Sequence, residues 1–182
     1  MIWDGLTPPY RTVVADPPWR YDEGWPPGPW SADKSRRRPL DYSSMPLAEV
    51  ASLPVAELAA PDAHLYLWTT NRYLRDAYAV AEAWGFAYSA TLVWCKPLMG
   101  WQPGGAFGNS AEFVLFARRG RPAVCERQNT TWFQWPRGHH SEKPAAFFDL
   151  VERVSAGPYV ELFARAPRLG WDHWGHGYEV AS

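Results

Sequence analysis

The stretch VVADPPW (residues 13–19) passes from apolar residues to a carboxylate, two prolines and a tryptophan. The apolar run predicts a β-strand that ends at Asp16. Proline fixes φ and has no N–H, so the turn is stiff, and Pro17 and Pro18 offer carbonyl acceptors but no donors. An ionised Asp also only accepts hydrogen bonds. Asp16 and the Pro17 carbonyl therefore form an acceptor pair suited to an amino group, with the flat ring of Trp19 beside them.

A purely structural interpretation of this motif stays open, in which Asp16 caps a turn and Trp19 packs in the core. The 12 tryptophans of the chain bear on the choice, since many of them fall outside strand-like runs. A core of this size cannot hide them all, and tryptophans on loops suit a pocket for flat ligands such as nucleobases. Any single one of them can equally fill space in a loop-rich protein.

Length and charge set broad limits. The chain has 182 residues and a net charge of −1, which predicts a single domain over residues 1–182. No overall basic field marks a nucleic-acid binder, although a local basic patch can serve. The opening MIWDGLTPPYRT is not a signal peptide, and no apolar run reaches membrane-spanning length. We therefore expect a cytoplasmic protein without membrane association.

Cysteine and histidine usage gives no metal signature. Cys95 and Cys125 are far apart without a C-x-x-C pair, which predicts neither a disulfide framework nor a zinc site. His139 and His140 are adjacent, but no further Cys or carboxylate follows at ligand spacing. We expect no bound metal.

Five short runs predict β-strands: TVVAD (12–16), AHLYLWT (63–69), YSATLVWC (88–95), EFVLFAR (112–118) and YVELFAR (159–165). Their nearly continuous apolar character is typical of parallel strands that are covered on both faces. Helical patterns lie between several of them, with apolar stripes in 73–85 and 143–157 and a weaker helix in 46–53. This alternation predicts an α/β domain with a mostly parallel sheet and helices on both faces.

The ends of the predicted strands point to a candidate pocket. In open α/β sheets, ligands bind beyond the carboxyl ends of the strands. The residues that follow the predicted strands are Asp16–Trp19, Thr69–Asn71, Cys95–Pro97 and Arg165. We expect them to line one rim, where separate motifs would form a single site.

The turn Asp16-Pro17-Pro18-Trp19 resembles the catalytic D-P-P-W of the adenine-N(6) methyltransferase family. That family includes the catalytic subunit of the eukaryotic messenger-RNA adenosine methyltransferase and many bacterial and phage members. The resemblance extends in order and rough spacing from residue 11 to about 177. It is carried further by DYSSMPLAEV (41–50), LYLWTTNRYL (65–74), GNSAEFVLFARRG (108–120), HSEKP (140–144), ELFAR (161–165) and GWDHWG (170–175).

The resemblance implies S-adenosylmethionine as methyl donor and a Rossmann-like methyltransferase fold in permuted order. The catalytic turn then comes early in the chain, and the donor-binding strand YVELFAR comes last. By accepting the two amino hydrogens of adenine, Asp16 and the Pro17 carbonyl would favour its nucleophilic state. Attack on the sulfonium methyl depends on positioning more than on a strong base. A target base in a duplex would have to leave the stack, with Trp19 as its support.

Further roles follow from the same resemblance. Asp16 and Lys143 are expected near both donor and acceptor, Arg165 at the donor's ribose or carboxylate, and Tyr42 and Glu112 at the border of the target adenosine. Lys143 could instead be a solvated lysine at a helix start, and Glu112 a surface carboxylate. Because a cation at a helix N-terminus opposes the helix dipole, a functional role for Lys143 is favoured.

Two segments depart from the family pattern. Donor contacts are expected at Trp171 and at His176, which stands where the family usually has an asparagine, so this contact should differ. Many members also carry an upstream segment that touches the donor's adenine. Here the short MIWDG segment, with Asp4, is the candidate to replace it.

These observations predict methylation of adenine in DNA rather than RNA, because the small stand-alone format resembles bacterial and phage members. A non-catalytic nucleic-acid-binding partner of the same fold is one alternative. A methyltransferase for a small molecule or free nucleotide is another. Target recognition would fall to residues 20–41, 97–110 or 126–139, or to a partner, and the oligomeric state stays open.

Overall fold

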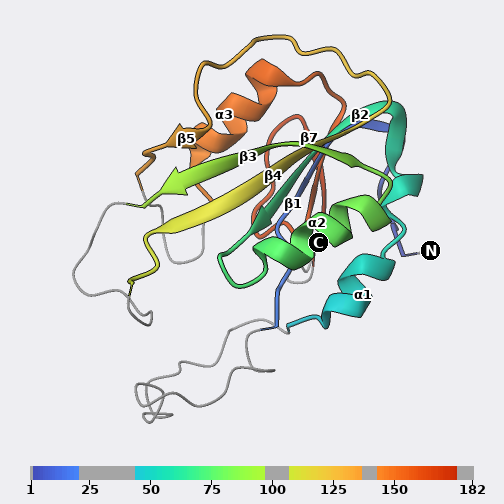
Figure 1. Ribbon diagram of the computed structural model, residues 1–182. Helices are drawn as coiled ribbons and strands as arrows, with labels where there is room; N and C mark the ends of the chain where they lie inside the picture. The colour runs from blue at the N-terminus through green and yellow to red at the C-terminus, as the bar shows by residue number, and fades with distance from the viewer. Residues whose placement is uncertain (1, 21–43, 97–106, 137–142, 176–182) are drawn as a thin grey trace.

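The computed structural model describes residues 2–20, 44–96, 107–136 and 143–175 (Figure 1). These residues form one sheet of seven strands in the order β5-β3-β4-β2-β1-β6-β7. The strands are β1 (Tyr10–Ala15), β2 (Ala59–Thr69), β3 (Ala87–Cys95), β4 (Ala111–Arg119), β5 (Trp132–Phe133), β6 (Tyr159–Leu162) and β7 (Trp171–Trp174). The helices are α1 (Leu47–Ser52), α2 (Leu74–Ala83) and α3 (Ala145–Val154), with a short 3-10 turn at Val55–Glu57.

Strand direction decides which residues meet at the functional edge of the sheet. Four neighbouring pairs are parallel, namely β1–β2, β1–β6, β6–β7 and β3–β5. β4 is antiparallel to both of its neighbours, β2 and β3. All other described strands therefore run one way and β4 runs against them. We call the edge that carries the carboxyl ends of these strands and the start of β4 the rim.

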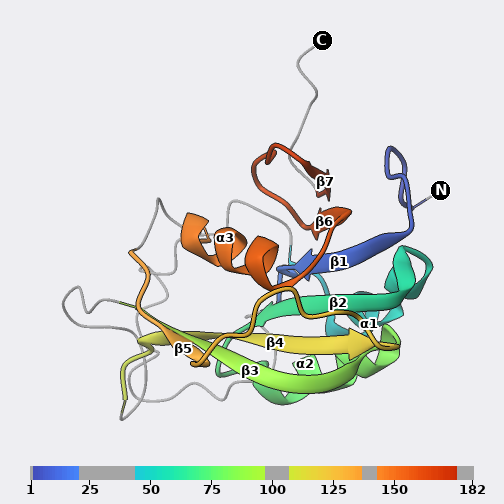
Figure 2. The ribbon, with the colours of Figure 1, turned by 90° about the horizontal axis from the view of Figure 1, so that it is seen from above.

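Helices cover both faces of the sheet (Figure 2). α1 and α2 lie on one face, where Val50, Val80 and Trp84 join the larger apolar core. α3 lies on the other face, where Phe147 and Val151 pack with strand residues in a second core. The α/β fold with a mostly parallel sheet and helices on both faces is thus confirmed, and the first strand lies beside β6 from near the end of the chain.

The predicted helices form where their apolar stripes predicted them. α3 follows Pro144, whose φ of −58° suits a helix start, and buries Phe147, Phe148, Leu150 and Val151. α2 buries Ala77, Val80 and Ala81. Gly85 follows α2 with a φ of +82°, the left-handed conformation that commonly ends a helix.

Two details of the strands differ from the sequence prediction. The expected strand 159–165 ends at Leu162, because Phe163 turns the chain with a φ of +63°. The sequence also gave no sign of β5 and β7, which are two and four residues long. Segments this short carry too few residues to show a strand period.

Among the described residues, no helix combines the length and apolar character needed to cross a membrane. Of the segments expected to recognise a target sequence, residues 21–41, 97–106 and 137–139 lie outside the described part.

Candidate functional site

The stiff turn after β1 lies at the rim and is held by backbone contacts on both sides. The N–H of Asp16 donates to the carbonyl of Leu162 in β6 at 3.4 Å. Within the turn, the Trp19 N–H donates to the Pro17 carbonyl at 2.8 Å, and the Met45 N–H donates to the Pro18 carbonyl at the same distance. A carbonyl oxygen has two lone pairs, so the Pro17 oxygen keeps one for a further donor.

Trp19 lies beneath this turn and is only 4% exposed. Its indole N–H donates to the Trp68 carbonyl at 3.1 Å. Its ring stacks on Tyr73, with ring centroids 5.3 Å apart and planes 16° apart. The structure therefore uses Trp19 to support the turn, and a stacking role on a ligand base stays a prediction.

Lys143 is the central cation of the rim. It directly precedes Pro144 and the start of α3. Its Nζ lies 2.9 Å from Asp16 Oδ2, 3.4 Å from Glu112 Oε2 and 4.4 Å from the centre of the Trp68 ring. Burial lowers the pKa of Lys143, but Asp16 and Glu112 outweigh this effect and raise the pKa above its usual value. Lys143 therefore stays charged between two carboxylates.

Glu112 reaches the rim because β4 is reversed. It lies near the start of that strand, opposite Trp94 close to the end of β3. Its Oε1 pairs with the Lys96 ammonium, and its Oε2 faces Lys143. Burial raises the pKa of Glu112, while Lys143 and Lys96 together hold it below its usual value. A carboxylate at the start of a strand thus joins groups that follow the ends of other strands.

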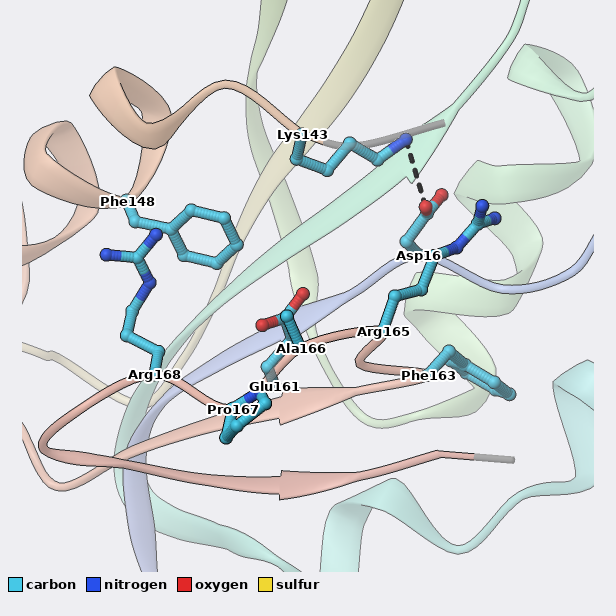
Figure 3. Close-up of a pocket in the computed structure, with 9 residues that line it drawn as sticks. All are labelled: Asp16, Lys143, Phe148, Glu161, Phe163, Arg165, Ala166, Pro167 and Arg168. Carbon is cyan, nitrogen blue, oxygen red and sulfur yellow. Dashed lines mark ion pairs between the residues drawn. The ribbon is translucent and has the colours of Figure 1, made fainter. Parts of the chain in front are cut away.

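A cleft opens beside Asp16 and Lys143 (Figure 3). Its walls carry both signs of charge, with Glu161 near the middle of the view and Arg165 and Arg168 on the segment after β6. The Arg168 guanidinium carbon lies 4.0 Å from the centre of the Phe148 ring. The remaining lining residues are Phe163, Ala166 and Pro167.

Glu161 and Arg168 were not predicted as site residues. Glu161 pairs in register with Val14, two residues before Asp16, on the strand next to it. Burial and the nearby Asp16 raise the pKa of Glu161 to about 7, against the opposing effect of Arg168 and Lys143. A signal existed in the sequence, since Glu161 is the one charged residue in the strand Tyr159–Leu162.

The segment that carries Arg165 is shaped by two unusual backbone positions. Phe163 adopts a left-handed φ of +63°, which is rare for a bulky residue and is typically retained at functional sites. Gly175 passes so close to Ala164 that a Cβ there would lie 2.5 Å from its carbonyl oxygen. Only glycine permits this approach, which holds the edge of the cleft against the end of β7.

The structure thus brings Asp16, Glu112, Lys143 and Arg165 together at the rim. Trp171 lies elsewhere. It pairs with Tyr159 at the start of β6, which is the opposite edge of the sheet. There it is 6% exposed, stacks on Tyr159 and donates its indole N–H to Glu152 at 2.7 Å.

The other predicted contacts are not at the cleft or cannot be placed. Asp4 is exposed in the N-terminal turn and is absent from the lining of the cleft. Next to it, Trp3 packs against Trp174 at the end of β7. Tyr42 and His176 lie outside the described residues.

In the described ranges, no three His, Cys, Asp or Glu side chains are grouped to hold a metal ion. His139 and His140 lie outside those ranges. Cys95 and Cys125 are both free thiols.

Comparison with known proteins gives a consistent family. The MT-A70 family model matches residues 10–177. The type II methyltransferase M.MunI of Mycoplasma sp. is 33% identical over 185 aligned positions, which cover 91% of this chain and 76% of that protein. The human N(6)-adenine-specific methyltransferase METTL4 is 25% identical, and the N6-methyladenosine RNA methyltransferase MTA1 of Cryphonectria parasitica is 28% identical.

The last two alignments each cover 92% of this chain, but only 37% of METTL4 and 51% of MTA1. The family match, in contrast, runs from the first residue of β1 past the end of β7 and includes every rim residue described above. The chain therefore belongs to the MT-A70 family.

Proposed function

We propose that this protein transfers a methyl group from S-adenosylmethionine to the exocyclic amino group of adenine in DNA. One observation carries the proposal: Asp16, in a turn of fixed acceptors, both lines the cleft and contacts Lys143. A carboxylate placed between the cleft and the acceptor carbonyl of Pro17 is suited to act on a donor and an acceptor together. Family membership supports the reaction class, because the relatives include named adenine methyltransferases.

The cleft fits a donor that carries charges of both signs and an aromatic base. Asp16 and Glu161 can attract its ammonium and sulfonium groups, and Lys143, Arg165 and Arg168 can bind its carboxylate and hydroxyl groups. Phe148 and Phe163 supply apolar surface at the same place. When bound, the donor supplies an electrophilic methyl group. The residues of the chain orient it and keep its charges balanced.

The acceptor side follows from the turn. Adenine's amino nitrogen is a weak nucleophile because its lone pair is shared with the ring. The Asp16 carboxylate and the Pro17 carbonyl, each accepting one amino hydrogen, would stabilise the pyramidal nitrogen at the moment of attack. Lys143 holds Asp16 from its Oδ2 side, which fixes the carboxylate in place. The chemistry then depends on alignment more than on proton abstraction.

DNA is proposed over RNA on the strength of the comparisons. The type II methyltransferase is 33% identical to this chain, whereas the relative named for RNA is 28% identical. A base within a duplex must leave the stack to reach the turn, which costs a few kcal/mol.

The test is incubation with labelled donor and unmethylated DNA, followed by digestion to nucleosides. We expect labelled N(6)-methyladenine with the wild type and its loss with Asp16→Ala. Arg118→Met, a charge change at the opposite edge of the sheet, serves as the matched control and should keep activity. Undiminished product from Asp16→Ala would refute the proposed role.

Two parallel assays separate the alternatives. In one assay, equal amounts of RNA or of free nucleotides replace the DNA. Methylation of one of these, without methylation of DNA, would reassign the acceptor. Calorimetry with the donor tests the non-catalytic alternative, because a pure nucleic-acid-binding partner should release no heat on donor addition. Binding of DNA should weaken steeply with salt if phosphates are contacted.

A further inference from the structure

A chain of four alternating charges crosses the rim, and its outermost member is Lys96. Lys96 pairs with Glu112 Oε1, Glu112 Oε2 faces Lys143 at 3.4 Å, and Lys143 pairs with Asp16 at 2.9 Å. The two lysines balance the two carboxylates, so the chain carries no net charge. Lys96 does not line the cleft. Within the described residues, its link to Asp16 runs through Glu112 and Lys143.

The position of Lys96 is fixed by its surroundings. Its backbone N–H donates to the Ser110 carbonyl at 2.7 Å, beyond the end of β3. Its ammonium lies 5.0 Å from the centre of the Trp94 ring. That indole is itself held, because its N–H donates to the Trp135 carbonyl at 3.0 Å. These contacts therefore hold the Lys96 side chain beside Glu112.

The distances show how the shared ammonium is divided. Lys143 Nζ lies 2.9 Å from Asp16 Oδ2 and 3.4 Å from Glu112 Oε2, so it is closer to Asp16. Coulomb attraction falls with distance and is weakened when one partner already faces an opposite charge. Glu112 has a second ammonium, that of Lys96, on its other oxygen, whereas Asp16 forms its ion pair with Lys143.

We infer that Lys96 is a positioning residue for methyl transfer: by engaging Glu112, it leaves Lys143 to hold the Asp16 carboxylate in its accepting geometry. Without Lys96, Glu112 attracts Lys143 more strongly, and Asp16 loses contact on its Oδ2 side. The inference deepens the proposed function and rests on it, because positioning is read out through turnover.

The test compares Lys96→Met, Lys96→Arg and Glu112→Gln with the double variant Lys96→Met/Glu112→Gln. We expect Lys96→Met to lower kcat about tenfold while KM for DNA stays within about twofold of the wild type. Lys96→Arg restores most of kcat, because it returns the cation. In the Glu112→Gln background, Lys96→Met changes kcat by less than about twofold, since its route to Asp16 is gone.

The pH dependence of kcat adds a second measurement, which should not change if Lys96 only stabilises the fold. Loss of the Lys96 cation lets the pKa of Glu112 rise, and protonation of Glu112 removes its attraction for Lys143, so the kcat deficit of Lys96→Met relative to the wild type should shrink as the pH falls. Arg118→Met, at the far end of β4, is the control for loss of one cation and should leave both kcat and its pH dependence unchanged.

Three outcomes overturn the inference: an unchanged kcat in Lys96→Met, a rise in KM for DNA alone, or an equal effect with and without Glu112. Thermal unfolding checks that each variant is folded, and Lys96→Gln replaces Lys96→Met if the latter is not. A wild type without product would refute the proposed function instead. The inference falls with it, whereas any of the three outcomes above, with an active wild type, refutes the inference alone.

Discussion

Helix α3 makes polar contacts with β2 and its neighbours at both ends, but the two ends differ in chemistry. Just before its first residue, Lys143 joins two carboxylates and lies over Trp68 of β2. All three charged side chains keep 15–20% of their surface exposed, and the cleft opens beside them. We call this group the charged end of α3.

The other end of α3 is neutral and closed. Ser155, directly after the helix, is fully buried, and its hydroxyl lies 2.8 Å from both the Tyr66 hydroxyl and His64 Nδ1. Burial and the charge of Arg118 lower the pKa of His64 to about 4, so the ring is neutral at physiological pH. We call this group the neutral end of α3.

The same strand serves both ends, since His64, Tyr66 and Trp68 alternate along one face of β2. The difference therefore comes from solvent access and partners. Buried neutral groups satisfy one another and stabilise the fold, whereas the charged end retains ions that can rearrange around a ligand. Changes at the two ends should then separate activity from stability.

Lys143→Met should have the largest effect. It leaves two carboxylates close together without their shared ammonium, and we expect kcat/KM to fall by about 100-fold or more. Kinetics with saturating and limiting donor measure the loss, and the melting temperature shows whether the fold persists. Activity within about threefold of the wild type would contradict the assignment of the charged end.

Glu161→Gln tests, through its pH dependence, the cost of holding Glu161 buried next to Asp16 of the charged end. The ordinary pKa of a glutamate, 4.5, is raised to about 7 in the folded protein, so the folded state binds more protons between these values. Stability contributed by this group is full below pH 4.5 and is lost as pH rises to 7. Glu161→Gln should therefore be more stable than the wild type above pH 7, by about 2–3 kcal/mol.

Chemical unfolding at several pH values measures this difference. The two proteins should converge near pH 4, where the glutamate is protonated in both states. A constant offset across the whole range would show that Glu161 does not titrate as described. Affinity for the donor should also weaken in Glu161→Gln, because the variant lacks a carboxylate that attracts the positive groups of the donor.

The contrast between the ends also marks what sequence can predict. Asp16 and Arg165 follow local signals, namely a proline turn and the end of a predicted strand, whereas Lys143 was placed through the family resemblance, with its position at a helix start in support. Glu112 was placed only through the family resemblance, because nothing local reveals that β4 runs backwards. Trp171 was expected at the donor because its motif matches the family, but the motif does not show how the segment pairs with its neighbour. The structure places Trp171 at the start of β7, opposite Tyr159.

The neutral end was missed entirely. His64 and Ser155 are 91 residues apart in the chain, and each is an ordinary residue in its local pattern. Their contact follows from how α3 lies along β2, which depends on the packing of the whole sheet. Arg168 was missed for a similar reason, because its role depends on the ring of Phe148 on another element.

Ser155→Ala tests the neutral end. It leaves the Tyr66 hydroxyl and His64 Nδ1 buried without this partner, which should cost about 1–3 kcal/mol of stability. We expect kcat to stay within about twofold of the wild type. Denaturant unfolding and steady-state kinetics on one preparation measure both, and a large loss of kcat would show that the two ends are coupled through α3.

Trp19→Phe should have the smallest effect on stability. It removes the indole donor to the Trp68 carbonyl but keeps a ring against Tyr73. We expect a loss of about 1 kcal/mol of stability, with a larger proportional loss of kcat than in Ser155→Ala because the turn at Asp16 loosens. The loss of kcat is compared with the loss of unfolding free energy in Trp19→Phe and in Ser155→Ala. An equal ratio in the two variants would show that Trp19 acts only as a core residue.

The reversal of β4 has a consequence for the evolution of specificity. β3 ends and β4 begins at the same edge, and the hydrogen bond from the Lys96 N–H to the Ser110 carbonyl closes the base of the connection between them. Any sequence inserted or exchanged between these two residues starts and finishes beside Glu112 without altering the register of the sheet. The sequence predicts that residues 97–110 contribute to target recognition, so exchange of this one connection is expected to change target preference while the groups on the neighbouring strands are inherited intact.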